Sequence, residues 1–181
     1  MLNTPNILTL LRVVMIPFFV AAFLTAGISD WVTLAIFALA AITDALDGYI
    51  ARKKNLVTDF GKLMDPLADK LMVITAFICF TAADIIHPLI TVTVVAREFF
   101  VTGLRGIATT NGKVIAADIW GKAKTVSQYV AIIVVLVKRS VGASSESFLG
   151  ILATVSIAAM IVLTIVSLIN YCIKNKEFLK G

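Results

Sequence analysis

Residues 44–70 read DALDGYIARKKNLVTDFGKLMDPLADK. Of the five carboxylates in this stretch, Asp59 is expected to be a loop charge, and four lie within or beside otherwise apolar segments: Asp44, Asp47, Asp65 and Asp69. An ionisable side chain at the centre of a bilayer costs at least about 2.5 kcal/mol, so such residues are functional by default. Four acids kept together need a compensating ligand, and oxygen donors suit hard divalent cations. We therefore expect a membrane enzyme built around a metal site.

The composition also indicates a membrane protein. Of 181 residues, 60% are apolar and only 15% are charged, against about 25% charged in typical soluble domains. Residues 147–173 carry no charge over 27 positions, more than the roughly 20 that cross a bilayer as a helix. We predict an all-α integral membrane bundle of six transmembrane helices, forming a single domain over residues 1–181. The other five spans are expected at 7–26, 31–50, 65–83, 87–104 and 118–137.

The charges fall at alternating ends of these segments. They lie at the C-terminal ends of 31–50 and 87–104 and at the N-terminal ends of 65–83 and 118–137. Helices that alternate in direction would gather them into one polar chamber, and the basic connections place it in the cytoplasmic half of the membrane. Both termini are then cytoplasmic, with Lys138 and Arg139 as the exceptions outside. We expect a bacterial cell membrane, contact with membrane lipids and no nucleic-acid partner.

Helical spacing turns the acids into a candidate site. Positions i, i+3, i+4 and i+7 share one stripe, which here holds Asp44, Asp47, Gly48 and Ala51. Asp65 and Asp69 share a face of the next helix with Gly61. If the two helices fold antiparallel, the four carboxylates converge and suit two divalent cations, Mg²⁺ or Mn²⁺, for phosphoryl chemistry. As an alternative, Asp65 caps a helix that begins at Pro66.

These residues fit the pattern DxxDGxxAR, eight residues, GxxxDxxxD in full, and so resemble the signature of the CDP-alcohol phosphatidyltransferases. The resemblance implies transfer of a phosphatidyl group from a CDP-linked lipid to an alcohol, with release of CMP. It further implies that Asp44, Asp47 and Asp65 ligate the metals, while Asp69 lies near the metals as a further ligand and acts as general base. The CDP moiety is expected to contact four residues of the signature: Gly48, Ala51, Arg52 and Gly61.

Two later segments point to the acceptor. Residues 96–106 (AREFFVTGLRG) and 120–125 (WGKAKT) resemble the branch of the family that joins CDP-diacylglycerol to sn-glycerol 3-phosphate. Four cations at the charged helix ends suit a phosphate dianion, and they are Arg97, Arg105, Lys122 and Lys124. Some of them could instead pair with Glu98 or Asp118, or only follow the positive-inside rule.

Several alternatives stay open at this point. A sister enzyme could use inositol phosphate, which the cations fit almost as well, or inositol or serine, which they fit less well. A cation transporter also carries intramembrane acids, although transporters usually hold them near the midplane. A catalytically inert protein with a structural metal is a third possibility. The uncharged last helix could also support a homodimer.

Overall fold

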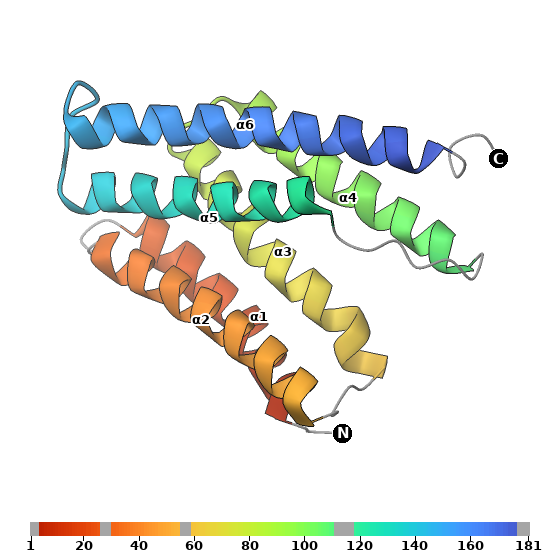
Figure 1. Cartoon of the computed structure of the whole chain (residues 1–181). Helices are drawn as coiled ribbons and strands as arrows, with labels where there is room; N and C mark the ends of the chain where they lie inside the picture. The colour runs from red at the N-terminus through yellow and green to blue at the C-terminus, as the bar shows by residue number, and fades with distance from the viewer. Residues whose placement is uncertain (1–3, 26–29, 55–58, 111–117, 177–181) are drawn as a thin grey trace.

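The computed structural model describes residues 4–25, 30–54, 59–110 and 118–176, and describes side chains for 10–25, 30–43, 70–110 and 118–176. Within these ranges the protein is all-helical, as predicted, and contains no strand (Figure 1). The helices are α1 (Thr4–Leu24), α2 (Asp30–Lys54), α3 (Asp59–Ala82), α4 (Pro88–Thr110), α5 (Ile119–Ser140) and α6 (Phe148–Lys174). Two of them, α5 and α6, are long and apolar enough to cross a membrane, and shorter apolar stretches occur in α1, α2 and α3.

Three helices extend beyond the apolar segments that predicted them. α2 continues to Lys54, α4 continues to Thr110, and α3 begins at Asp59. The residues added to α2, 51–54, are Ala, Arg and two Lys, which are good helix formers, so a helix need not end where its apolar stretch ends. The alternative in which Asp65 caps a helix beginning at Pro66 is therefore wrong, because α3 has already begun at Asp59.

Two packed groups of helices make up the bundle. α5 and α6 lie antiparallel along their length, and α1 packs against both α2 and α3 (Figure 1). α2 and α3 in turn pack on α5, while α4 packs on α3 and α6. Across the described residues, the main chains of α4 and α5 do not pack directly on each other. The C-terminal ends of α2, α4 and α6 and the N-terminal ends of α3 and α5 all lie on one side of the bundle.

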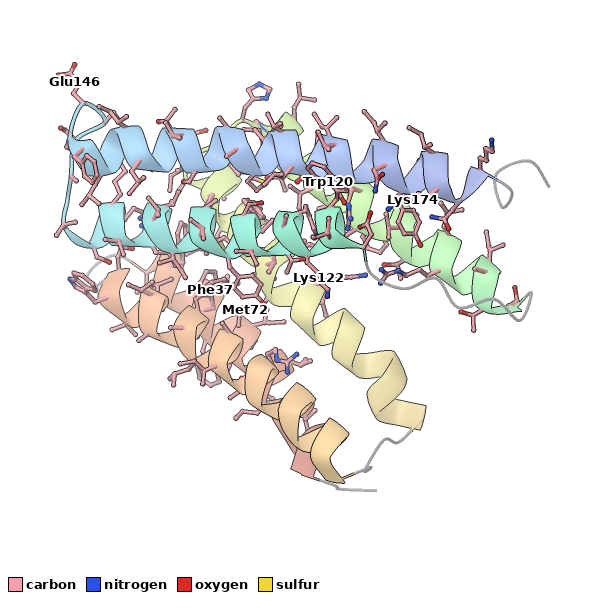
Figure 2. The ribbon with its side chains drawn as sticks, in the orientation of Figure 1. Phe37, Met72, Trp120, Lys122, Glu146 and Lys174 are labelled. Atoms are coloured by element: carbon pink, nitrogen blue, oxygen red, sulfur yellow. The ribbon has the colours of Figure 1, made fainter. Side chains whose placement is uncertain are left out.

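An aromatic cluster ties the two groups together. The ring of Phe19 on α1 lies 6.3 Å from that of Phe23 and 6.2 Å from that of Phe37 on α2. The ring of Phe37 lies 5.5 Å from that of Tyr129 on α5, and the ring of Phe23 lies 5.7 Å from that of Phe80 on α3. Offset aromatic pairs at such distances stabilise a core beyond the area they bury. Figure 2 shows Phe37 and Met72 between α2, α3 and α5.

The end of the bundle away from the gathered helix ends is closed by direct contacts. Arg139 near the end of α5 forms an ion pair of 3.1 Å with Asp30 at the start of α2. Its guanidinium also lies 3.9 Å from the ring centroid of Phe23 on α1. The α5–α6 loop folds closely over the start of α6, where a Cβ on Gly150 would lie only 2.3 Å from the carbonyl oxygen of Ser145. Glu146 marks this loop in Figure 2.

Candidate functional site

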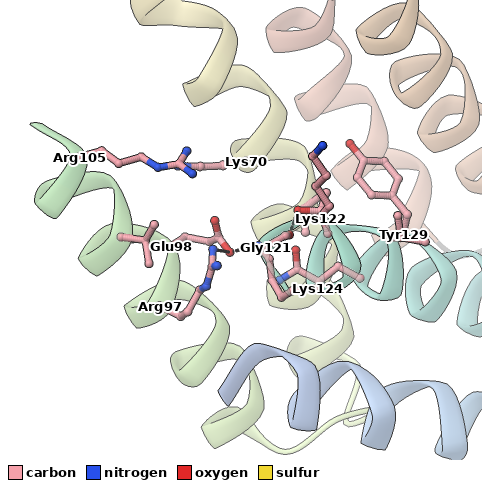
Figure 3. Close-up of a pocket in the computed structure, with 13 residues that line it drawn as sticks. Lys70, Arg97, Glu98, Arg105, Gly121, Lys122, Lys124 and Tyr129 are labelled. Carbon is pink, nitrogen blue, oxygen red and sulfur yellow. Dashed lines mark hydrogen bonds and ion pairs between the residues drawn. The ribbon is translucent and has the colours of Figure 1, made fainter. Parts of the chain in front are cut away.

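A cavity of about 560 Å³ opens between α3, α4 and α5. Among the residues that the structure describes, its lining contains one acidic residue, Glu98, and five basic residues: Lys70, Arg97, Arg105, Lys122 and Lys124. We call this cavity the basic pocket. Figure 3 shows Arg105 and Glu98 entering from α4, and Lys122 and Lys124 entering from α5. The pocket therefore includes all four cations that the sequence assigned to the acceptor phosphate, and its charge favours an anionic ligand.

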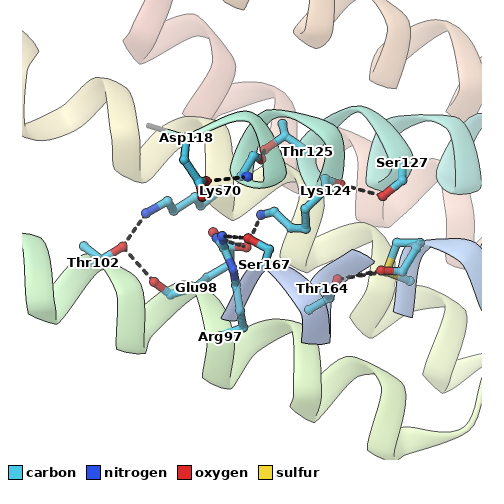
Figure 4. Close-up of polar contacts among 12 residues, drawn as sticks. Lys70, Arg97, Glu98, Thr102, Asp118, Lys124, Thr125, Ser127, Thr164 and Ser167 are labelled. Atoms are coloured by element: carbon cyan, nitrogen blue, oxygen red, sulfur yellow. Dashed lines mark hydrogen bonds and ion pairs between the residues drawn. The ribbon is translucent and has the colours of Figure 1, made fainter. Parts of the chain in front are cut away.

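The carboxylate of Glu98 contacts two of these cations. Glu98 is only 5% exposed and its Oε1 accepts hydrogen bonds from Lys124 Nζ and from Arg97 Nη1, the latter at 3.3 Å (Figure 4). Arg97 is also buried, and its Nη2 donates to Ser167 Oγ on α6 at 2.6 Å. The expected alternative, in which Glu98 pairs with some of the cations, is thus confirmed for two of them. Buried charges are tolerated because they are paired and hydrogen-bonded in this way.

The other two predicted cations differ from this pair. Within the described residues, Arg105 and Lys122 form no ion pair with the protein. Arg105 is half-buried and lies over the ring of Tyr171 on α6, 5.9 Å from its centroid. Lys122 is exposed at the start of α5. These two positive charges remain available to an anion that enters the pocket.

Asp118 holds the first turn of α5 in place. Its Oδ1 accepts a hydrogen bond of 2.8 Å from the backbone N–H of Gly121, which is the N-cap interaction of a helix. Its Oδ2 accepts from Asn170 Nδ2 and lies 3.6 Å from Lys174 Nζ, both on α6. The alternative that Asp118 pairs with one of the four predicted cations is therefore wrong. Its partners belong to α6, and it fixes the segment that carries Lys122.

Three described residues of the pocket have a buried side-chain nitrogen without a hydrogen-bond partner: Arg97 Nε, Arg105 Nε and Gln128 Nε2. Gln128 is 2% exposed, lines the basic pocket, and lies one helical turn after Lys124 on α5. Its side-chain Nε2 has no hydrogen-bond partner among the described residues. Most buried side-chain polar atoms have a partner, so an exception inside a pocket indicates a place where a ligand oxygen can be received.

Comparison with known proteins identifies the family. A sequence model of the CDP-alcohol phosphatidyltransferases matches residues 2–169. The chain belongs to this family. Three relatives named CDP-diacylglycerol--glycerol-3-phosphate 3-phosphatidyltransferase support the assignment. The protein from Bacillus subtilis is 37% identical over 99% of this chain and 98% of its own length. Those from Rickettsia felis and Haemophilus influenzae are 35% and 37% identical, covering 97% and 93% of this chain and 97% and 91% of their own lengths.

The acidic signature that resembles this family lies on α2 and α3. Asp44, Asp47, Gly48, Ala51 and Arg52 fall within Asp30–Lys54. Gly61, Asp65 and Asp69 fall within Asp59–Ala82, and the two helices contact each other. The side chains of all eight residues lie outside the described ones, so their assignment to metal and CDP binding stays a prediction. As a donor set, four carboxylates fit hard cations such as Mg²⁺ or Mn²⁺.

Sequence reasoning did not assign three residues that the structure adds to the pocket or to its network: Lys70, Gln128 and Ser167. Lys70 Nζ donates to Thr102 Oγ1, which in turn donates to the backbone carbonyl of Glu98 at 2.7 Å. Spacing along one helix does not reveal these contacts, because they join different helices. The sequence did contain a signal for Gln128, because a lone glutamine in an apolar segment predicts a polar residue within the membrane, which needs a partner or a function.

Proposed function

We propose that this protein transfers the phosphatidyl group of CDP-diacylglycerol to sn-glycerol 3-phosphate, giving phosphatidylglycerophosphate and CMP. The observation that carries the proposal is the excess positive charge of the basic pocket: among the residues that the structure describes, five basic side chains and one carboxylate line it, and Arg105 and Lys122 form no ion pair. A phosphate dianion would neutralise this excess charge, whereas a neutral alcohol would leave it unpaired. The names of the relatives supply the same pair of substrates.

The acceptor phosphate would be held by the two cations that form no ion pair among the described residues, Arg105 and Lys122. Arg97 and Lys124 would add positive charge from the wall, where Glu98 orients them. An arginine can bind a phosphate through two parallel hydrogen bonds, which fixes the direction of the remaining alcohol. The pocket would therefore aim an acceptor hydroxyl toward the donor instead of merely concentrating anions.

The reaction requires little covalent chemistry from the protein. The acceptor hydroxyl forms a bond to the phosphorus nearer the diacylglycerol, the bond from that phosphorus to the CMP oxygen breaks, and CMP leaves with the electron pair. Asp69 accepts the hydroxyl proton, and Gly48, Ala51, Arg52 and Gly61 bind the CDP moiety. Asp44, Asp47, Asp65 and Asp69 would hold two divalent cations, Mg²⁺ or Mn²⁺. Metals bound at these carboxylates would neutralise the negative charge of the diphosphate.

We further propose that all six helices span the membrane, with the basic pocket and both termini on the cytoplasmic side of a bacterial cell membrane. Large apolar side chains are exposed on every helix: Phe18, Leu39, Ile78, Phe99, Val130 and Val155. An apolar surface on all sides of a bundle is typical of lipid contact. A homodimer through the outer face of α6 is compatible with this arrangement, and cross-linking in membranes would test it.

Release of CMP by the purified full chain in detergent tests the function. The assay contains CDP-diacylglycerol, Mg²⁺ or Mn²⁺, and in turn glycerol 3-phosphate, inositol phosphate, inositol or serine. We expect release with glycerol 3-phosphate and its loss on chelation of the metal. Release with a different acceptor only would refute the acceptor assignment, and no release with any acceptor would refute the transferase proposal.

Asp69→Asn provides the test of the general base. We expect turnover to fall by about 10²–10⁴, the usual contribution of a positioned base. Asp84→Asn is the matched control, because Asp84 is an exposed loop residue with φ of 53° and asparagine tolerates that backbone region. Normal turnover of Asp69→Asn would remove Asp69 from the role of base.

A further inference from the structure

The basic pocket is bounded by two helices whose main chains do not pack on each other. α4 carries Arg97, Glu98 and Arg105, and α5 carries Lys122 and Lys124, yet the two helices meet only through side chains. The ion pair between Glu98 and Lys124 spans this separation. It therefore limits how far apart the two walls of the pocket can lie.

The same carboxylate also fixes the wall toward α6. Glu98 Oε1 accepts from Arg97, whose other terminal nitrogen donates to Ser167 on α6. The side chains of Glu98, Arg97 and Lys124 are each less than 10% exposed, so none of them can move freely into solvent. One oxygen atom thus sets the positions of two cations, leaving Arg105 and Lys122 without an ion-pair partner in the described structure.

From these contacts we propose that Glu98 is the positioning residue of the basic pocket. It holds Lys124 of α5 at a fixed distance across the cavity and holds Arg97 of its own helix toward α6, and through these two cations it selects a small phosphate-bearing alcohol over a larger one. This inference rests on the proposed function. Glu98 does not itself contact the acceptor phosphate, because its negatively charged carboxylate and the negatively charged phosphate would repel each other.

Glu98→Gln tests the proposal, because it keeps the shape of the side chain and removes its charge. A hydrogen bond between charged groups typically contributes about tenfold or more to an equilibrium constant. We expect the KM for glycerol 3-phosphate to rise about tenfold or more, while the KM for CDP-diacylglycerol stays within about twofold. The preference in kcat/KM for glycerol 3-phosphate over inositol phosphate should fall by a similar factor.

Two further variants separate positioning from general damage. Glu98→Asp keeps the charge and shortens the side chain, so we expect it to recover part of the acceptor affinity that Glu98→Gln loses. Glu146→Gln makes the same chemical change on an exposed loop at the opposite end of the bundle and should match the unsubstituted protein. An unchanged acceptor KM in folded Glu98→Gln, or equal increases for donor and acceptor, would overturn the proposal.

A binding measurement distinguishes failure of this inference from failure of the proposed function. We would measure the rise in Tm that glycerol 3-phosphate produces in detergent, with glycerol as the control without phosphate. A rise that Glu98→Gln abolishes would support the positioning role even if no CMP is released. No rise in the unsubstituted protein would refute both, and an equal rise in the variant would refute the positioning role alone.

Discussion

Gln128→Leu should stabilise the empty protein and weaken its binding of the acceptor. Gln128 is 2% exposed and its Nε2 has no hydrogen-bond partner among the described residues. A buried donor left unsatisfied costs about 1–3 kcal/mol, and an apolar side chain of similar size removes that cost. We therefore expect the free energy of unfolding to increase by about 1–3 kcal/mol, which for a chain of this size raises Tm by about 2–12 °C.

The effect on binding should have the opposite sign. If the amide of Gln128 donates to an oxygen of the acceptor, the leucine variant loses one hydrogen bond, with a net contribution of about 0.5–1.5 kcal/mol. That energy corresponds to a rise of about 2- to 13-fold in the acceptor KM. The donor KM should not change, because the predicted CDP site lies on α2 and α3.

Thermal unfolding in detergent and steady-state CMP release measure the two effects on the same preparations. Thr164→Val is the matched control, since Thr164 is equally buried but its Oγ1 already donates to the carbonyl of Met160 at 2.7 Å. This change removes a satisfied polar group and should leave Tm unchanged or lower it. A Gln128→Leu variant with lower Tm and unchanged acceptor KM would refute the reasoning.

Three further substitutions test other parts of the structure. Arg105→Ala should raise the acceptor KM about tenfold or more with little change in the donor KM; equal changes in both would make Arg105 structural or donor-facing. Asp118→Ala should lower the free energy of unfolding by about 0.5–2 kcal/mol through loss of the α5 cap. Asp118→Asn keeps the cap but loses the Oδ2 atom that accepts from Asn170 and pairs with Lys174, so we expect a smaller loss of stability than in Asp118→Ala, measured by thermal unfolding. Gly150→Ala gains about 1 kcal/mol of helix propensity but forces a Cβ to within 2.3 Å of the Ser145 carbonyl oxygen, a clash that costs about 1–3 kcal/mol. We therefore expect a net loss of up to about 2 kcal/mol in the free energy of unfolding, seen as a lower Tm, and unchanged KM values. A higher Tm for that variant would show that the loop relaxes freely.

The helical architecture and the basic pocket could be predicted from the sequence because both depend on patterns along the chain. Apolar segments with charges at alternating ends predict that Arg97 and Arg105 on one helix meet Lys122 and Lys124 on the next, and the structure brings all four to one cavity. This convergence needs only the alternation of helix direction. It does not depend on the angle at which the helices cross.

The pairing inside the pocket could not be predicted, because it depends on that crossing. Glu98 and Asp118 were equivalent candidates for neutralising the cations. In the structure, Glu98 forms ion pairs with Lys124 and Arg97, whereas Asp118 pairs with Lys174 on α6. Helix ends were also uncertain, since α3 begins at Asp59, six residues before the apolar segment that predicted it, and its first three residues, Asp, Phe and Gly, are poor helix formers.

The separation of α4 from α5 has a consequence for the energetics of ligand capture. α4 and α5 do not have to be pulled apart to admit an anion between them, so binding on this side of the pocket requires the rearrangement of side chains and the displacement of water. A site that is preorganised in this way retains more of its interaction energy as affinity, because little is lost in ordering or opening the protein. A ligand with as few atoms as a three-carbon phosphate ester can therefore be held without a large contact surface.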